Sequence, residues 1–268
     1  MNVATTWHWA GLDLAILGPA LLAGLLVLAT HVPLGVQVLA RGIVFIDLAI
    51  AQIAGIGVIA ADALGWEPQG AAVQIAAAAS ALLGAALLTW TERRWPEIQE
   101  AVIGVSFVVA SCIGLLLLAG NPHGGEHLKD LLVGQILWVT TAQLGAMAAL
   151  SALILALWFG ARERLGRSGF YLLFALAVTG SVQLVGVYLV FASLILPALA
   201  TRRRQGAARL RAGWLLGALA YAGGLALSAL LDWPSGPLVV IVMALLAVLW
   251  ARLGPRPAAV PDVLKSRP

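Results

Sequence analysis

The residue whose type and position most clearly suggest chemistry is Asp47, which lies several residues into an apolar run at residues 42–64. A carboxylate inside an apolar run of membrane length is energetically expensive, so it usually faces a partner charge or a water-filled path. One interpretation is that Asp47 is a ligand or gate on a transport path. The alternative is a structural ion pair, for instance with Arg41, six residues earlier.

Two amides are further polar candidates inside apolar runs. Gln52 and Gln183 each either line a transport path or hydrogen-bond to a neighbouring helix. The single cysteine, Cys112, lies inside an apolar run and is interpreted as a small buried side chain. One cysteine excludes a disulfide framework. His8 and His31 stand alone in the sequence and are interpreted as structural.

A possible metal-binding loop lies between two apolar runs, at residues 121–130. His123 and His127 flank Glu126 there, and a His-x3-His pair with a carboxylate can hold zinc or a similar ion. The two glycines at 124–125 interrupt the helix that would align these ligands. A solvated loop outside the membrane is therefore the alternative interpretation.

Enzyme signals are missing from the chain. It contains no Walker A, HExxH or GxSxG motif, so we predict no catalytic residues and no permanently bound cofactor. Any ATP that powers this protein would be hydrolysed by a separate subunit. The net charge of +4 comes from short arginine clusters, which membrane topology explains without invoking nucleic acid as a partner.

The elements that must position these residues are membrane helices. The chain is 62% hydrophobic and only 10% charged, too few charges to cover a soluble globule. Its apolar runs are continuous rather than alternating and approach the ~20 residues that span a bilayer, which favours helices over a barrel. We predict an all-α polytopic transmembrane bundle with about 8–9 membrane segments, from runs at residues 14–30, 42–64, 71–90, 101–119, 142–160, 170–200, 213–231 and 237–252.

The charged loops predict the orientation of this bundle. One set of loops carries the arginines and should be cytoplasmic, with the N-terminus outside and the C-terminus inside. The opposite set holds Glu67, the loop at 121–130 and Asp232. The arginine set consists of Arg41, Arg93, Arg94, Arg162, Arg164, Arg167, Arg202, Arg203, Arg204, Arg209, Arg211, Arg252 and Arg256.

The apolar run at 170–200 must enter the membrane and return, because Arg167 and Arg202 belong on the same side. We expect two short helices or a re-entrant pair that bends near residues 181–186. Irregular backbone at membrane depth is tolerated where it is buried in protein or lines a cavity. This run therefore indicates that the bundle contains a pathway.

Three stretches of the sequence resemble the zinc/manganese-type (type 3) family of ABC transporter permeases. Residues 185–202, VGVYLVFASLILPALATR, resemble the family segment VGxLLVxALLIxPAxxAR. Leu34-Gly35 followed by RGIVFID at 41–47 resembles LG…RRMxFxGDxLxHxxLxG, and LVGQIL at 132–137 is similar to its GxIL segment. The matches keep the family order from about Pro19 to Arg252.

The resemblance implies a membrane permease subunit of an ABC importer for a divalent metal ion, with Asp47 as a metal ligand on the path. It implies a separate ABC ATPase, an extracytoplasmic substrate-binding protein and two copies of the permease in the lipid bilayer. The location would be the bacterial inner membrane. This chain departs from the family at Ala51, where the family has a histidine four residues after the aspartate.

Three alternatives stay open. The missing histidine favours import of a metal chelate or a cobalamin-like cargo, and the broken run at 170–200 also fits a secondary transporter without an ATPase. A non-transporting membrane scaffold is the third. We expect a permease domain at residues 1–253 and a loose cytoplasmic tail at 254–268, which holds four prolines.

The family segment also implies which residues contact the ATPase. We expect residues 196–201 to form a short cytoplasmic helix with Pro197 near its start, where a missing N–H is harmless. Arginines follow directly and either contact the ATPase or only enforce topology. The proposed coupling residues are Leu196, Pro197, Ala198, Ala200, Thr201, Arg202, Arg203 and Arg204.

Overall fold

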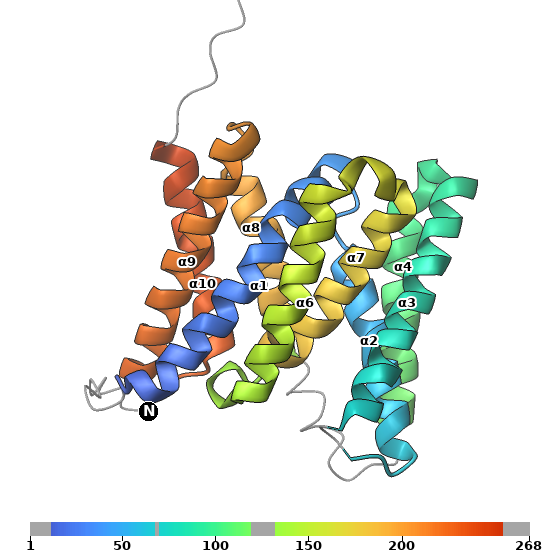
Figure 1. Cartoon of the computed structure of the whole chain (residues 1–268), viewed down its shortest axis with the longest axis horizontal. Helices are drawn as coiled ribbons and strands as arrows, with labels where there is room; N and C mark the ends of the chain where they lie inside the picture. Colours follow the sequence, from blue (N-terminus) through green and yellow to red (C-terminus); the bar gives the residue numbers. More distant parts are fainter. Residues whose placement is uncertain (1–11, 68–69, 119–131, 254–268) are drawn as a thin grey trace, which may run out of the picture.

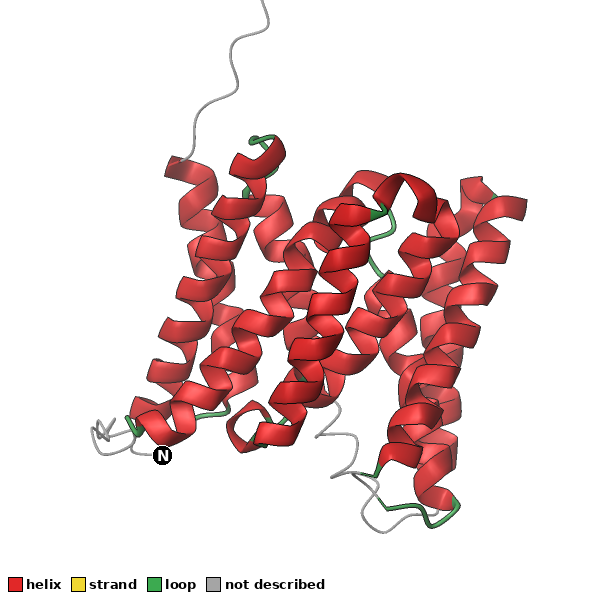
Figure 2. Ribbon diagram, viewed as in Figure 1, coloured by secondary structure: helices red, strands yellow, loops and turns green. Residues whose placement is uncertain are grey.

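The computed structural model describes residues 12–67, 70–118 and 132–253, and these residues form a bundle of α-helices (Figures 1 and 2). A bilayer core offers no water to the backbone, so each segment must satisfy its own N–H and C=O groups. An α-helix does this, and apolar side chains then face the lipid. In chain order the helices are α1 (Leu14–Arg41), α2 (Ile46–Ala63), α3 (Ala71–Arg94), α4 (Gln99–Leu118), α6 (Thr141–Gly160), α7 (Arg162–Val185), α8 (Val187–Ala200), α9 (Gly206–Leu231) and α10 (Ser235–Leu253).

Within the described ranges, seven helices are long and apolar enough to cross a membrane. The 18-residue α2 and the 14-residue α8 pack among them. Short 3-10 turns at Pro96–Ile98 and Ile136–Trp138 precede α4 and α6. The polytopic helical bundle predicted from the sequence is confirmed, and this chain is a multi-pass membrane protein.

The arginine-bearing ends of the helices gather at one end of the bundle. Figure 1 shows the α1–α2, α3–α4, α6–α7 and α8–α9 turns at the top, with the end of α10. The start of α1 and the α2–α3, α7–α8 and α9–α10 turns lie at the bottom. The structure thus separates the two sets of loops, and the cytoplasmic assignment of the arginine end stays a prediction.

The long apolar run turns back at Gly186, as the arginines on both sides of it require. Helix α7 ends at Val185 and α8 begins at Val187. Gly186 has φ 79° and ψ 162°, a conformation open to glycine but strained for other residues. The predicted bend near residues 181–186 is confirmed.

Two details of the helices differ from the sequence-based expectation. Helix α1 continues to Arg41 through Pro33, whereas its apolar run ends at Thr30. Residues 196–200 are the last turn of α8 rather than a separate short helix, so the expectation that Pro197 starts a helix is wrong. Gly186, ten residues before Leu196, sets the start of that helix instead.

The core of the bundle lies around α1, α7 and α8. Gly24 of α1 leaves room for the ring of Tyr221, whose hydroxyl hydrogen-bonds to Ser193 Oγ at 3.0 Å. The Trp214 indole donates to the Leu28 carbonyl at 3.1 Å. These contacts tie α8 and α9 to α1, because buried polar groups need hydrogen-bond partners.

Candidate functional site

Asp47 lies in the first turn of α2 and is buried, with only 1% of its surface exposed. Neither carboxylate oxygen has a hydrogen-bond partner among the described residues. A buried carboxylate without partners is destabilising, so it is expected to have a function that offsets this penalty. Carboxylate oxygens are ligands for hard divalent cations, and both oxygens of Asp47 are available for such a role.

Arg41 does not neutralise Asp47. Its Nη1 atom lies 3.9 Å from Glu92 Oε1, and its guanidinium carbon lies 4.3 Å from the centre of the Phe170 ring. Glu92 Oε2 is also 3.7 Å from Nε of Arg167. The ion pair between Arg41 and Asp47 that we considered as an alternative is therefore absent from the described part of the chain.

A second carboxylate near Asp47 was not singled out from the sequence. Glu100, in the first turn of α4, accepts a hydrogen bond from the Phe45 amide at 3.3 Å through Oε1, and its Oε2 has no partner among the described residues. This hydrogen bond places Glu100 beside the turn that precedes α2, two residues before Asp47. The sequence could have pointed to Glu100 as an acidic residue at the start of an apolar run. Its contact with a turn 55 residues earlier depends on helix packing and could not be predicted from the sequence.

A largely apolar groove of about 670 Å³ runs along α8. Gln52 lines it together with Leu48, whereas Asp47 does not. Successive helix positions differ by about 100°, so Asp47 and Gln52 point about 140° apart and the structure does not bring them together. The lining residues are Leu48, Gln52, Phe107, Leu132, Val187, Tyr188, Phe191, Ala192, Leu196, Pro237, Val240, Ile241 and Ala244.

Gln183 belongs to a different polar contact. Its side-chain oxygen accepts a hydrogen bond from Gln74 Nε2, which joins α7 to α3. His31 is fully buried between Thr30 Oγ1, 3.3 Å from Nδ1, and Ser181 Oγ, 3.2 Å from Nε2. Both residues therefore hold helices together, the outcome expected for His31 and one of the two considered for Gln183.

The sequence stretches that resemble the permease family meet around α8. A Cβ on Gly134 would lie 2.2 Å from the Val185 carbonyl carbon, and one on Gly186 would lie 2.4 Å from the Gly134 nitrogen. The Gln135 amide donates to the Leu184 carbonyl at 3.2 Å nearby. A Cβ on Gly35 would lie 2.0 Å from the Leu194 oxygen, so glycine is required where these backbones touch.

The proposed coupling residues lie at the end of α8 and in the following turn. Pro197, Ala198 and Thr201 are buried, Leu196 and Ala200 are half-buried, and the Ala198 carbonyl accepts a hydrogen bond from Arg209 Nη2 at 3.1 Å. Arg202 and Arg203 are exposed, whereas the Arg204 guanidinium carbon lies 5.4 Å from the centre of the Trp250 ring. Only part of this segment is therefore free to contact another protein.

The predicted histidine site, His123 with His127, lies outside the described residues. Among the residues that the structure describes, no group of three or more His, Cys, Asp or Glu side chains is placed to hold a metal ion. Cys112 is exposed on α4 rather than packed inside, so that expectation is wrong.

The sequence is similar to those of known metal-transport permeases. A family model described as the ABC 3 transport family matches residues 13–170 and 160–253. The chain is 28% identical over 257 residues to the "High-affinity zinc uptake system membrane protein ZnuB" of Haemophilus influenzae, covering 87% of this chain and 96% of that protein. It is 27% identical over 190 residues to a "Probable metal transport system membrane protein" of Chlamydia muridarum, covering 63% of this chain and 65% of that protein.

Two solved structures share the fold. One is "PsaBC from Streptococcus pneumoniae in complex with Fab", with a TM-score of 0.72 and 21% identity, covering 89% of this chain and 91% of that chain. The other is "An inward-facing conformation of a putative metal-chelate type ABC transporter", with a TM-score of 0.63 and 18% identity, covering 87% of this chain and 85% of that chain. At these identities the likeness establishes the fold alone.

Proposed function

Because this chain belongs to the ABC 3 transport family, we propose that it is the membrane-spanning permease subunit of an ABC importer for a divalent metal ion of the zinc/manganese class. The observation that carries the proposal is the family match, which extends from residue 13 to residue 253. The metal is the transported substrate rather than a resident cofactor. Relatives named for zinc uptake and for metal transport support this class of cargo.

The assembly would contain parts that this chain lacks. A separate ABC ATPase would bind and hydrolyse ATP, since the sequence has no Walker A motif. An extracytoplasmic binding protein would deliver the metal, and the complex would lie in a bacterial inner membrane. Residues 1–253 would form the permease domain and residues 254–268, outside the described structure, a cytoplasmic tail.

A second copy of the permease would complete the path. The groove along α8 is apolar and carries half-exposed aromatic side chains such as Tyr188, which is 50% exposed. Gln52 is a polar side chain in this groove, so in a dimer it would lie between the two copies. Gln183 would act on the path indirectly, by fixing α7 against α3.

Asp47 would bind the metal during its passage. Its carboxylate lies in the first turn of α2, in the stretch that resembles the family's aspartate segment, and its oxygens have no hydrogen-bond partner among the described residues. At 1% exposure the carboxylate is closed off from solvent, so neighbouring side chains must move before an ion reaches it. Helix α8 runs from the Gly186 turn to the proposed ATPase contact and would transmit that movement.

Uptake of metal by cells or proteoliposomes that contain the full complex tests the proposal. Asp47→Asn should reduce uptake of radioactive zinc or manganese by at least about tenfold, because loss of one charged ligand removes more than about 1.4 kcal/mol of metal binding. Asp62→Asn, at the other end of α2, is the matched control and should transport normally. Size-exclusion profiles should show that both variants fold and assemble.

Normal uptake by Asp47→Asn would contradict the role of Asp47. Uptake of a metal chelate or cobalamin without uptake of free zinc or manganese would contradict the metal-ion cargo while keeping the permease. The chelate should be tested because this chain has Ala51 where the family has a histidine. A histidine there would lie on the same helix face as Asp47 and could share a bare metal ion with it.

A further inference from the structure

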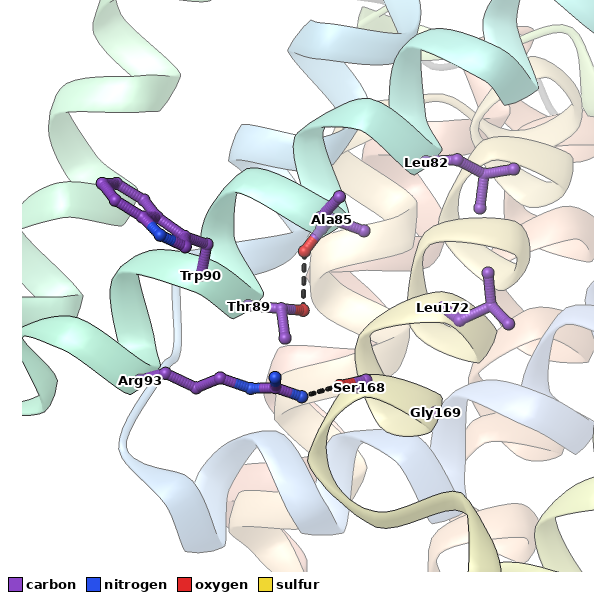
Figure 3. A pocket seen from close by; sticks show the side chains of 9 residues that line it. Leu82, Ala85, Thr89, Trp90, Arg93, Ser168, Gly169 and Leu172 are labelled. Atoms are coloured by element: carbon purple, nitrogen blue, oxygen red, sulfur yellow. Dashed lines mark hydrogen bonds between the residues drawn. The ribbon is translucent and has the colours of Figure 1, made fainter.

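A second groove, of about 420 Å³, lies between α3 and α7 near their arginine-bearing ends. Figure 3 shows the side chains of both helices bordering it, with Arg93 reaching across to Ser168. It is separate from the groove along α8, with which it shares no lining residue. The lining residues are Leu82, Ala85, Ala86, Thr89, Trp90, Arg93, Ser168, Gly169 and Leu172.

Small side chains on both helices create this groove. Ala85 and Ala86 line it on α3, and Ser168 and Gly169 line it on α7. The helical path of α7 is interrupted just before, at Gly166, which has φ 55° and ψ −151°. The two helices therefore pack without filling the space near this end.

The groove opens on a surface that suits hydrocarbon rather than water. Leu83, Leu87 and Leu172, beside it or lining it, are 73%, 50% and 45% exposed. Trp90 at its rim is 55% exposed, and Trp side chains favour the headgroup level of a bilayer. Lipid acyl chains are the natural cover for such a surface.

The arginine end of the groove carries a positive charge that no carboxylate of the described residues neutralises. Arg93 is exposed, and its Nη2 donates a hydrogen bond to the Ser168 hydroxyl oxygen. The nearby ion pairs of Arg41 and Arg167 are both made with Glu92. Most of the five N–H donors of Arg93 therefore remain available, and a guanidinium is well suited to binding phosphate.

We propose that this groove binds an anionic phospholipid of the cytoplasmic leaflet, with its phosphate on Arg93 and one acyl chain along Leu82 and Leu172. Basic pockets between membrane helices on the cytoplasmic side commonly bind such headgroups. The apolar walls distinguish the ligand from a free phosphate, which would leave them uncovered.

Lipid retention by the purified full-length protein tests this proposal. The protein is delipidated in detergent and mixed with phosphatidylglycerol or with phosphatidylcholine, and native mass spectrometry measures the bound fraction. Wild type should retain phosphatidylglycerol preferentially. Arg93→Gln should weaken this binding about fivefold, the contribution of one arginine near a headgroup. Arg94→Gln, its neighbour outside the groove, is the matched control and should bind like wild type.

A second pair of variants tests the acyl-chain site without changing charge. Ala86→Phe should fill the groove and reduce retention, whereas Leu87→Phe, exposed beside the groove, should not. Equal losses in Arg93→Gln and Arg94→Gln, or equal binding of phosphatidylcholine, would overturn the proposal. So would inorganic phosphate that raises the thermal midpoint as much as phosphatidylglycerol does, because the site would then be a phosphate site.

Discussion

Glycines at backbone contacts, more than charged residues, connect the parts of this protein that lie far apart in the sequence. Gly134 and Gly186 come from different loops, and each has a positive φ, 74° and 79°. A Cβ on either would overlap the backbone of the other segment. Residues 132–137 and 185–202, two of the family-like stretches, are therefore in contact because both contain glycine at the point of approach.

Replacing Gly186 with alanine should destabilise the protein more than any ordinary helix substitution. A strained backbone conformation alone costs about 1–3 kcal/mol, and the overlap with the Val133 carbonyl carbon at 2.5 Å adds to this. Thermal unfolding of the purified protein in detergent measures the effect. Gly145→Ala in α6 is the control, since a Cβ there has nothing within 4 Å, and it should leave the midpoint unchanged or slightly higher. Equal midpoints for the two variants would contradict the contact.

At the scale of residues, the sequence predicted which residues lie in helices better than it predicted which side chains form hydrogen bonds or ion pairs. Asp47 was expected inside a helix and is there, because its place depends only on the local apolar run. The pairing of Arg41 with Glu92 and the approach of Glu100 to Phe45 were not predicted. Both join segments about 50 residues apart, and only helix packing, which local pattern does not encode, decides such contacts.

At the scale of elements, α8 connects the proposed path to the proposed ATPase contact. It begins at the Gly186 turn, lines the apolar groove and ends at Ala200 beside the exposed Arg202 and Arg203. Pro197 lies inside the helix, where neighbouring helices can compensate for its missing N–H. We expected a helix to start near Pro197 because proline is common at helix starts. The helix starts at Val187 instead, directly after Gly186.

A charge at the end of α8 should uncouple the transporter. Ala200→Glu places an acidic group where we expect the ATPase to dock, and an unmatched charge at an interface costs several kcal/mol. The amount of ATPase that co-purifies with the permease should fall by about tenfold or more. Ala207→Glu, exposed in the first turn of α9 where an acidic residue suits the helix dipole, is the control.

Membrane insertion of both variants should be unchanged, as measured by their yield in the membrane fraction. ATPase binding and transport at wild-type levels by Ala200→Glu would show that the end of α8 is not the coupling element. Loss of binding by both variants would indicate a general effect of negative charge at this end of the bundle, and would equally remove the support for α8.

At the scale of the whole molecule, the separation of charge between the two ends predicts the orientation. The arginine-bearing turns gather at one end of the bundle, whereas Glu67 and Asp232 belong to turns at the other. The positive-inside rule then places the arginine end in the cytoplasm. The approximate number of helices and their alternating direction were predictable because they follow from apolar runs and arginines. The exact helix ends and the two grooves follow from packing and were not predictable.

Cysteine labelling in intact cells checks this orientation. In a Cys112→Ser background, a membrane-impermeant thiol reagent should label Glu67→Cys and spare Gln205→Cys until the cells are permeabilised. Both positions are exposed in the structure, so the difference in labelling reports the side of the membrane rather than burial. The reverse pattern would mean that the arginine end faces outward and would contradict the proposed contact with an ATPase.

The turn at Gly186 also matters while the protein is being made. The insertion machinery meets residues 170–200 as one uninterrupted apolar run of a length that a single tilted helix could occupy. If it were inserted that way, α9 and α10 would be threaded in the opposite direction. The break at Gly186, followed by five arginines between 202 and 211, favours a hairpin instead. The glycine that shapes the folded turn and the positive charge after α8 therefore favour the same topology already at the stage of membrane insertion.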